Sequence, residues 1–350
     1  MPISPYQPLY LLKRGEVVES IHYGAAAIVN AQEELIAWLG EPQVVTYLRS
    51  SAKPFQALPF LERGGAERFN LTLKEIALLC ASHSGSDEHV ATVQSIQQKT
   101  GVSEGELLCG VHPPYDEIIA ERMRLCGEQP TPNRHNCSGK HTGMLAFARM
   151  ENLPTADYIN PSHPIQKIIL ETFAQMCDLP ASGVAVGIDG CSAPNFAVPL
   201  YNAALAFARL CEPSRLSKPR ASACSLITRA MTAHPEMVAG NGRFDTRLMQ
   251  VANGRMIAKA GAEGYQGIGL LPGALGDCSP ALGIALKISD GDARGKVRAA
   301  VSLEILRQLG ALSQDELQAL AEFGPILPLY NWRKIAIGEA QPCFQLERNL

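Results

Sequence analysis

The sequence lacks any apolar run that is long enough to cross a membrane. A membrane helix needs about 18 or more consecutive apolar residues, and none of the 350 residues belongs to such a run. The first residues, Met1-Pro2-Ile3-Ser4-Pro5, also lack the charged segment followed by an apolar segment that marks a signal peptide. We therefore expect a cytoplasmic protein that has no membrane partner.

An excess of charge of one sign and a regular cysteine pattern are also missing. The formal net charge is -3 and no long basic run occurs, which argues against a nucleic-acid partner. The 10 cysteines are scattered and include no Cys-x-x-Cys pair. In a reducing compartment most of them should be small buried residues rather than disulfide partners. A cysteine in a loop therefore needs a separate explanation.

Repeats and low-complexity linkers are absent as well. A chain of this length with 46% hydrophobic residues can bury a large core. We expect one domain over residues 1–350, with room for two lobes. Strand-like runs lie near both ends of the chain and helical patterns fill its middle, which favours a mixed α/β or α+β fold with a sheet packed by helices. The strand-like runs are residues 9–12, 25–29, 44–48, 255–259 and 284–288.

Capping signals define several helices in the middle of the chain. Thr72-x-x-Glu75 before an apolar run is a capping box and predicts a helix as far as about Cys80. Ser162 with Pro164 likewise predicts the start of an amphipathic helix. The short apolar run 184–188 predicts a buried strand that leads into a loop.

The segment Ser50-Ser51-Ala52-Lys53 places a serine three residues before a lysine. On a helix this spacing puts both side chains on one face. A serine hydroxyl needs a base to take its proton, and a lysine can be that base when burial or a neighbouring cation lowers the lysine pKa. Alone, the segment also fits a helix-capping serine followed by a solvated lysine.

Pro54 determines where this serine lies relative to the helix. Proline has no N–H and is tolerated only near a helix start. We therefore expect Ser50 in the turn that enters the helix, and the helix itself from about Pro54. Backbone N–H groups at the helix start could then stabilise developing negative charge. Arg49 is a candidate for the neighbouring cation.

Two further segments follow in an order that is typical of serine–lysine hydrolases. Class A β-lactamases and penicillin-binding proteins carry S-x-x-K, then a serine-containing triplet, then K-T-G on a strand. Here Ser82-His83-Ser84 and Lys259-Ala260-Gly261 follow, although the triplet lacks its final asparagine and alanine replaces threonine. The order predicts two serine–lysine pairs in one cleft. The alternatives are a loop serine for Ser82 and an exposed strand lysine for Lys259.

Residues 133–143 form a polar, glycine-rich segment with two histidines, a cysteine and a lysine. Cys191 lies in a second loop of similar character. Loop cysteines near histidines indicate a tetrahedral zinc site or a reactive thiol, and spacing alone favours Cys137 with His135 or His141 as ligands. A cysteine buried under a loop is the alternative.

Five motifs, present together and in order, resemble the rhizobial-type L-asparaginase family. This is the thermolabile, inducible class, distinct from bacterial type I and II and from plant-type asparaginases. The resemblance extends from about His22 to Asp290. The motifs are Arg49-Ser50-Ser51-Ala52-Lys53-Pro54, Cys80-Ala81-Ser82-His83-Ser84-Gly85, His135-Asn136-Cys137-Ser138-Gly139-Lys140-His141, Gly187-Ile188-Asp189-Gly190-Cys191 and Lys259-Ala260-Gly261-Ala262-Glu263-Gly264.

The resemblance implies a fold similar to serine β-lactamases, with a largely antiparallel sheet packed by helices. It implies hydrolysis of L-asparagine to L-aspartate and ammonia by a homodimer, with one zinc ion per subunit near the active site. A lysine ligand to zinc must be deprotonated. The implied residues are the catalytic pairs Ser50 with Lys53 and Ser82 with Lys259, the zinc ligands Cys137, Lys140 and Cys191, and the substrate contacts Arg49, His141 and Asp189.

Three hypotheses follow for function. The first is an asparaginase that forms an acyl-enzyme, with Ser50 favoured over Ser82 as nucleophile because its base lies one helical turn away. The second is a glutaminase, or a β-lactam or D-peptide hydrolase, of the same fold; the missing signal peptide argues against the hydrolases that act outside the cytoplasm. The third is a non-catalytic zinc- or amino-acid-binding protein, which the presence of all four nucleophile and base residues disfavours.

Overall fold

The structure, a computed structural model, describes residues 4–349. Its contacts divide the chain into two compact units. Unit 1 is the described part of Met1–Arg49, Val198–Glu212 and Arg247–Leu350, and unit 2 is Ser50–Ala197 and Pro213–Thr246. Each unit is therefore assembled from segments that are far apart in the sequence. The expectation of one domain over residues 1–350 stays a prediction.

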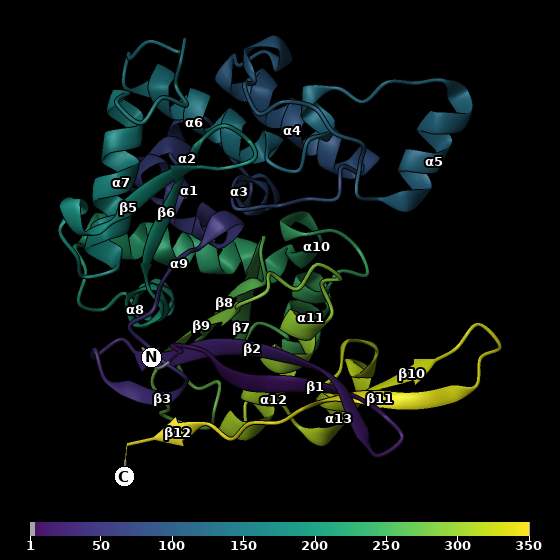
Figure 1. Cartoon of the computed structure of the whole chain (residues 1–350). Helices are drawn as coiled ribbons and strands as arrows, with labels where there is room; N and C mark the ends of the chain where they lie inside the picture. The colour runs from purple at the N-terminus through teal and green to yellow at the C-terminus, as the bar shows by residue number, and fades with distance from the viewer. Residues whose placement is uncertain (1–3, 350) are drawn as a thin grey trace. The chain divides into compact units, whose positions relative to one another are not determined.

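Unit 1 is built on a nine-stranded sheet with the central order β10-β11-β1-β2-β9-β8-β7, to which β3 and β12 add (Figure 1). Every strand pair described in this sheet is antiparallel. The prediction of a largely antiparallel sheet is thus confirmed. The strands are β1 (Gln7–Arg14), β2 (Val17–Asn30), β3 (Leu35–Leu39), β7 (Met256–Gly261), β8 (Tyr265–Leu270), β9 (Leu282–Ile288), β10 (Leu327–Tyr330), β11 (Ala336–Pro342) and β12 (Glu347–Arg348).

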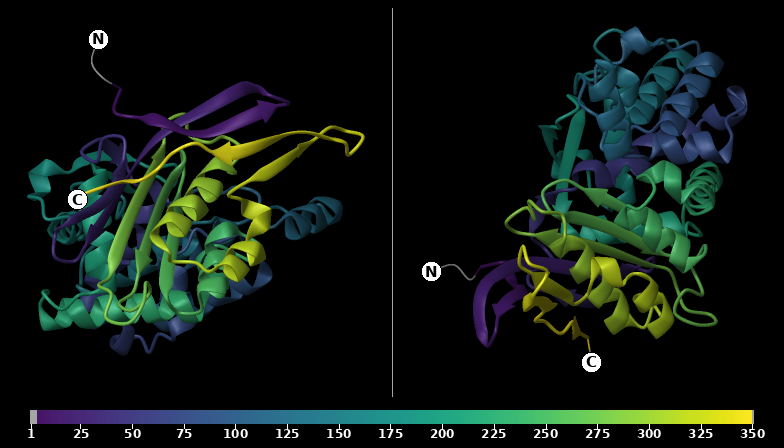
Figure 2. Two further views of the ribbon diagram at one scale, coloured as in Figure 1. Left: turned by 90° about the horizontal axis from the view of Figure 1, so that it is seen from below. Right: turned by 90° about the vertical axis from the view of Figure 1, so that its right-hand side faces the viewer.

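Helices pack on this sheet, and glycines allow one of them to approach closely. Helix α8 (Leu200–Cys211) lies against β2, β8 and β9. A Cβ atom at Gly283 would stand 1.8 Å from the Ala204 carbonyl oxygen of α8, so only glycine fits there. Helix α12 (Val297–Leu309) also packs on the sheet (Figure 2). Its Arg298 donates a hydrogen bond to Gln266 of β8. Helix α13 (Gln314–Ala319) also belongs to unit 1, and the boundary between the units falls within α11 (Phe244–Ala252).

Unit 2 is mainly helical. Helix α1 (Lys53–Glu62) packs against α6, α7 and α9, and α3 packs against α4, α6 and α9. Phe173 of α7 lies edge-on to Phe55 of α1 at 5.9 Å and stacks on Phe196 at 4.8 Å. The other elements are α2 (Gly65–Arg68), α3 (Leu73–Leu79), α4 (Asp87–Thr100), α5 (Glu117–Cys126), α6 (Ser138–Met150), α7 (Pro164–Met176), α9 (Lys218–Ala233), α10 (Pro235–Val238), β5 (Ala185–Ile188) and β6 (Pro194–Pro199).

The capping signals correctly located helix starts in unit 2. Thr72 and Glu75 form the predicted capping box at α3. Helix α7 begins at Pro164 as predicted, but its N-cap is His163 instead of Ser162. The prediction of a buried strand at 184–188 was wrong, because β5 is largely exposed and lies at the edge of its small sheet. An edge strand can be apolar without being covered on both faces.

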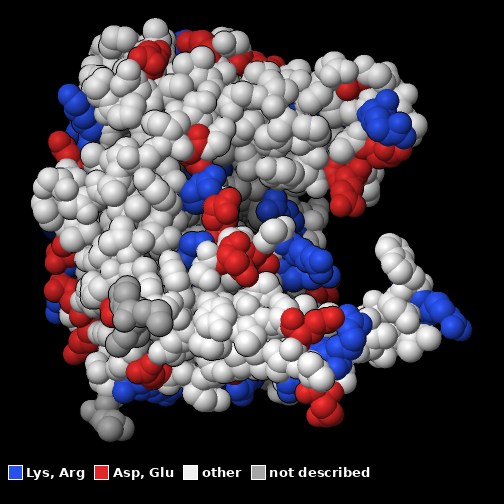
Figure 3. Space-filling model, in the orientation of Figure 1, with Lys and Arg blue, Asp and Glu red and all other residues white. Residues whose placement is uncertain are grey.

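The surface shown in Figure 3 carries acidic and basic side chains mixed together, separated by wide uncharged areas. This mixture agrees with the small formal net charge of -3. Within residues 4–349, none of the helices has both the length and the apolar character that a membrane span requires.

Candidate active site

Lys53, the first residue of α1, is the centre of a buried polar site in unit 2. Its side chain is 1% exposed. The Nζ atom lies 2.5 Å from the Ala81 carbonyl oxygen, 2.9 Å from the Ser82 Oγ and 3.4 Å from the Asn136 carbonyl oxygen. Lys53 therefore joins the start of α1 to the loop after α3 and to the segment that precedes α6.

The turn that leads into α1 is a 3₁₀ turn over Arg49–Ala52. It contains Ser50, and Pro54 follows in the first turn of the helix, as the sequence predicted. Arg49 has φ +52°, a left-handed conformation that is uncommon for residues other than glycine. The hydrogen bond from Lys53 goes to Ser82, and within residues 4–349 no hydrogen bond joins Lys53 to Ser50.

Ser82 is held in place by its neighbours in the loop after α3. Its backbone N–H donates to the Val238 carbonyl at 2.9 Å. The next residue, His83, is fully buried, and burial holds its pKa well below the ordinary value, so the ring is neutral. Its Nδ1 accepts from the Gly85 N–H at 3.1 Å, and its Nε2–H therefore donates to the Ser138 Oγ at 2.8 Å. This bond connects the Ser82 loop to the first turn of α6.

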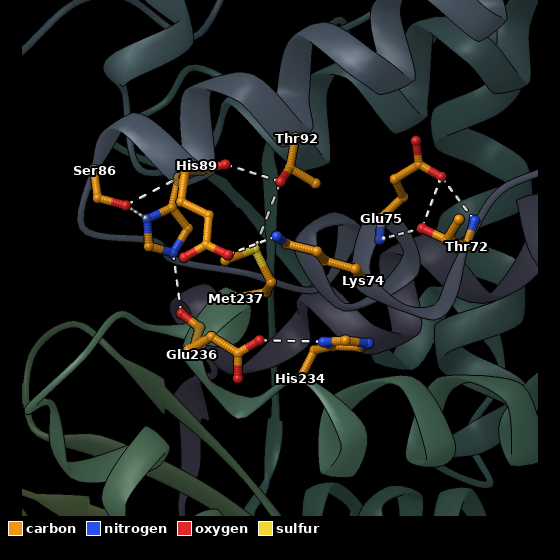
Figure 4. A network of polar contacts seen from close by, with 10 residues as sticks. Thr72, Lys74, Glu75, Ser86, His89, Thr92, His234, Glu236 and Met237 are labelled. Carbon is orange, nitrogen blue, oxygen red and sulfur yellow. Dashed lines mark hydrogen bonds and ion pairs between the residues drawn. The ribbon is translucent and has the colours of Figure 1, made fainter.

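A second polar network is centred on His89 (Figure 4), whose ring lies against His83. His89 of α4 stacks on His83 with ring centroids 4.9 Å apart. The two ring nitrogens of His89 lie 2.5 Å from the Ser86 Oγ and 3.0 Å from the Glu236 carbonyl oxygen. Glu236 also pairs with His234 at 3.1 Å. These contacts tie α4 and α10 to the loop that carries Ser82, which limits how far that serine can move.

Cys137, Lys140 and Cys191 meet in the interior of unit 2. Cys137 precedes α6, Lys140 lies in its first turn, and Cys191 follows β5. Lys140 Nζ donates to the Cys191 Sγ at 2.9 Å. The hydrogen bond from Cys137 lowers the pKa of Cys191, and Lys140 lowers it further. The neighbouring Cys191 and burial raise the pKa of Cys137 well above its ordinary value, so Cys191 is the more acidic of the two thiols.

This cluster has the donor chemistry of a zinc site, with two sulfurs and one nitrogen. Among residues 4–349 no group of three or more His, Cys, Asp or Glu side chains is placed to hold a metal ion. A third protein ligand must therefore come from another residue type, and Lys140 is the nitrogen that lies beside Cys191. The residues fit the implied ligand set, while zinc itself stays a prediction.

His141 and Asp189, the implied substrate contacts, are close to this cluster in the sequence, since His141 follows Lys140 and Asp189 lies two residues before Cys191. His141 is fully buried, and its Nδ1 lies 2.7 Å from the Tyr158 hydroxyl. Burial lowers the pKa of His141 to about 4. Asp189 is partly exposed, and its backbone N–H donates to the Ala193 carbonyl at 2.9 Å, which closes the loop that carries Cys191.

Lys259, Arg49 and Glu263 belong to unit 1. Lys259 is fully buried on β7, so the alternative of an exposed strand lysine is wrong. It stands opposite Gly267 of β8, and its Nζ donates to the Ala260 carbonyl at 2.8 Å. Arg49 lies 3.8 Å from Glu263 in a loose ion pair. The pairing of Lys259 with Ser82 stays a prediction from the resemblance.

Sequence reasoning missed some partners of these side chains. The Ala81 and Asn136 carbonyls, which accept from Lys53, lie inside quoted motifs, but backbone groups leave no signal in a sequence. Tyr158 was also missed. It is fully buried beside His141, yet it lies outside all five motifs, and its surroundings in the sequence are ordinary.

A buried lysine at the start of a helix, hydrogen-bonded to a serine of a neighbouring loop, is the arrangement expected of a hydrolase with an activated hydroxyl. The family described as L-asparaginase II matches residues 11–342. The chain therefore belongs to the L-asparaginase II family, and its class is that of the asparaginase and glutaminase amidohydrolases. This confirms the resemblance inferred from the five motifs. A comparison with curated proteins gives no match.

Solved structures that resemble this chain include two bacterial glutaminases. One is the Bacillus subtilis glutaminase YbgJ in a covalent complex with 5-oxo-L-norleucine, with 11% identity, a TM-score of 0.38 and coverage of 83% of this chain and 89% of that one. The other is a Bacillus glutaminase in 4.3 M NaCl, with 13% identity, a TM-score of 0.38 and coverage of 83% and 92%. At these TM-scores the likeness carries no conclusion on substrate or mechanism.

Proposed function

We propose that this protein is an L-asparaginase that hydrolyses L-asparagine to L-aspartate and ammonia through a serine activated by Lys53. The observation that carries the proposal is the 2.9 Å contact between the Lys53 Nζ and the Ser82 Oγ, in a chain of the L-asparaginase II family. A general base must lie within about 2.6–3.2 Å of the group whose proton it takes. The contact meets that requirement without any movement of the chain.

The surroundings of Lys53 suit the neutral amine that a base must be. A neutral amine has two N–H bonds and one lone pair. The Ala81 and Asn136 carbonyls can only accept hydrogen bonds, so they take the two N–H groups. The third neighbour, the Ser82 hydroxyl, can donate its proton to the lone pair. The same three neighbours can accept from the three N–H groups of the ammonium that forms when Lys53 takes the proton, so the site accommodates both states of the proposed base.

The proposal therefore departs from the sequence preference for Ser50 as nucleophile. In the proposed reaction the serine oxygen attacks the side-chain amide carbon and its proton passes to Lys53. Lys53 then protonates the leaving ammonia, and water releases aspartate from the acyl-enzyme. Contacts at a free active site can rearrange when substrate binds. Ser50, which precedes Lys53 by one helical turn, is for that reason kept as a second candidate in the tests.

Zinc, held by Cys137, Lys140 and Cys191, forms part of the proposal. When bound there, zinc would act as a Lewis acid and as a link between the start of α6 and the loop after β5. The proposal routes no step of the reaction through the metal, because the serine and Lys53 account for nucleophile and base. A homodimer in the cytoplasm is also proposed, on the resemblance alone.

Ammonia release from L-asparagine, L-glutamine and buffer alone, with nitrocefin as a β-lactam probe, tests the substrate. We expect ammonia from asparagine at the highest kcat/KM. Folded protein that releases none would contradict the proposal. Preference for glutamine would favour the glutaminase alternative, and opening of the nitrocefin ring would favour the β-lactam hydrolase.

Mass spectrometry after treatment with a reactive asparagine analogue tests the nucleophile. We expect the adduct on Ser82, and expect it to disappear in Ser82→Ala but to persist in Ser50→Ala. An adduct on Ser50 alone would restore the sequence preference. Ser95→Ala, which removes a serine on α4 that bonds to Glu75, serves as a control that should keep both adduct and activity.

A further inference from the structure

The Nε2 edge of the His141 ring has no nitrogen or oxygen atom as a hydrogen-bond partner among residues 4–349. Its Nε2 atom is buried and makes no hydrogen bond of good geometry among residues 4–349. The neighbouring group that acts on this edge is the sulfur of Cys191. The opposite edge, at Nδ1, lies 2.7 Å from the hydroxyl of Tyr158. The proton on the ring can therefore sit beside either a hydroxyl or a sulfur.

Tyr158 decides between these two positions. Its hydroxyl accepts a hydrogen bond from the Leu108 N–H at 2.9 Å, and a backbone N–H can only donate. The phenol must then direct its own hydrogen elsewhere, and it is fully buried. Among the described residues its other hydrogen-bond neighbour is His141 Nδ1. If Nδ1 carried the ring proton, the buried phenol hydrogen would have no acceptor, so Nδ1 must be the acceptor.

We propose that Tyr158 is a positioning residue that fixes His141 in the Nε2–H tautomer, as a hydrogen-bond donor toward the Cys191 sulfur and not as a metal ligand. The resulting chain runs from the Leu108 N–H to the Tyr158 hydroxyl, and from that hydroxyl to His141 Nδ1. The ring then presents Nε2–H to the sulfur that already receives a hydrogen bond from Lys140. The Leu108 N–H and the Tyr158 hydroxyl each have an acceptor in this chain, at 2.9 Å and 2.7 Å.

The spacing within residues 133–143 left open whether His141 is a zinc ligand, and the proposed tautomer answers that question. A histidine can bind a metal only through a nitrogen that has a free lone pair. In the chain above, the lone pair of Nδ1 is used by Tyr158 and Nε2 carries the proton. His141 therefore orients Cys191 from outside any ligand set, as histidines and their hydrogen-bond partners commonly do around metal sites. The inference goes beyond the proposed asparaginase activity and does not depend on it.

Nitrogen NMR of full-length, metal-free protein labelled with ¹⁵N-histidine tests the tautomer directly. The two tautomers differ in which ring nitrogen resonates as protonated, and His141→Gln identifies the His141 signals. We expect the Nε2–H pattern in the native chain. In Tyr158→Phe we expect the Nδ1–H tautomer to appear, because the hydroxyl that required a bare Nδ1 is gone. An Nδ1–H pattern in the native chain would overturn the proposal, as would an unchanged pattern in Tyr158→Phe.

Tyr10→Phe is the matched control. Tyr10 is also buried, and its hydroxyl bonds only to the Pro325 and Ala340 carbonyls of unit 1, both at 3.1 Å. Its removal should leave the His141 signals unchanged. If Tyr158→Phe does not fold, the native spectrum alone still decides the tautomer. None of these NMR measurements requires enzymatic activity. Failure of the asparaginase proposal can therefore be distinguished from failure of the proposal on the His141 tautomer.

Addition of zinc to the native chain provides a second test of whether His141 binds the metal directly. We expect the His141 signals to keep the Nε2–H pattern when zinc is bound, and His141→Gln to weaken zinc binding by about 10- to 100-fold, as for a residue that supports a ligand. Loss of the ring N–H from His141 on zinc binding would show direct ligation and overturn the proposal.

Discussion

At the scale of single residues, Lys53 contributes both to the structure and to the proposed chemistry. Its nitrogen satisfies two buried carbonyls and contacts the Ser82 hydroxyl. Buried polar groups without partners cost roughly 1–3 kcal/mol each, so these carbonyls also stabilise the position of the lysine. A test of its chemical role must therefore separate lost catalysis from lost folding.

Lys53→Met should lower kcat by at least about 10²-fold, because it removes the base while keeping a side chain of similar length. Steady-state ammonia release measures the change, and circular dichroism verifies that the variant is folded. Lys74→Met is the matched control, since Lys74 lies on the surface of α3 and pairs with Glu88 at 2.6 Å. Activity of Lys53→Met near that of the native chain would rule out Lys53 as the base.

Double variants show which serine works with Lys53. If Ser82 and Lys53 act as a unit, Lys53→Met combined with Ser82→Ala should be no slower than either single variant, because removing one member already abolishes the function of the pair. Ser50→Ala should then change kcat/KM by the same factor in the native chain and in Lys53→Met, because Ser50 acts independently of Lys53. The opposite pattern of kcat/KM values would identify Ser50 as the partner.

The sequence predicted the local structure around Lys53 better than the contacts of its side chain. The motif that contains Ser50, Lys53 and Pro54 correctly indicated an entry turn followed by a helix, because proline restricts where a helix can begin. It suggested a hydrogen-bond partner within the same turn, whereas the Lys53 side chain contacts Ser82, 29 positions away. Spacing along the chain reports local neighbours, and it says nothing about a loop that folds back from another helix.

At the scale of the element, the close approach of α6 to α3 positions the Cys137 and Lys140 side chains. Gly139 lies between them in the sequence, and a Cβ atom there would stand 2.4 Å from the Leu78 carbonyl oxygen of α3. This glycine is required by contact between two helices, not by an unusual backbone angle. Any side chain at this position must push the start of α6 away from α3.

Gly139→Ala should destabilise the fold by about 1–3 kcal/mol, as overpacking does, and should lower both activity and zinc affinity by moving Lys140. Chemical denaturation and a zinc titration measure the two effects. Gly105→Ala is the control, because nothing lies within 4 Å of a Cβ atom there. Native-like stability and zinc affinity in Gly139→Ala would show that the two helices tolerate separation.

Glu75 of α3 predicts a dependence of stability on pH. Burial acts to raise its pKa, but hydrogen bonds from Lys99, Thr72 and Ser95 outweigh burial and hold the pKa below its ordinary value of 4.5. The folded state therefore favours the ionised carboxylate. Its contribution to stability is complete above the pKa of the unfolded chain and is lost as the pH falls through that value toward the lower folded pKa.

Glu75→Gln should accordingly lower the free energy of unfolding at pH 7 by roughly 1.5–3 kcal/mol. The gap to the native chain should narrow as the pH falls below 4.5. Urea denaturation at several pH values measures this gap. Glu67→Gln, at an exposed position on α2, should leave stability within about 0.5 kcal/mol of the native chain. A gap for Glu75→Gln that does not change with pH would contradict the assignment.

Elements with capping signals were predicted well, and those defined only by tertiary contacts were not. Thr72 and Glu75 determine the start of α3 through their own side chains, so the sequence carries the information. Strand β5 shows the opposite case. Its apolar residues fit a buried strand, but burial depends on what packs against the strand, and Ile188 is 62% exposed. Strands β10 and β11 were missed. Strand β11 pairs with β1 from the opposite end of the chain, and β10 is held in the sheet by its pairing with β11.

At the scale of the whole molecule, the proposed zinc ion should stabilise the native state, because an unfolded chain does not hold the three ligands together. A ligand at 100 times its dissociation constant adds about 2.7 kcal/mol to the free energy of unfolding.

We expect zinc to raise the melting temperature of metal-free protein and a chelator to reverse the rise. Cys191→Ser should abolish the response, since it removes the sulfur that Lys140 contacts. Cys278→Ser, at an exposed thiol, should retain it and so exclude nonspecific binding. A melting temperature that zinc leaves unchanged in the native chain would remove zinc from the proposal, while leaving the contact between Lys53 and Ser82 as its basis.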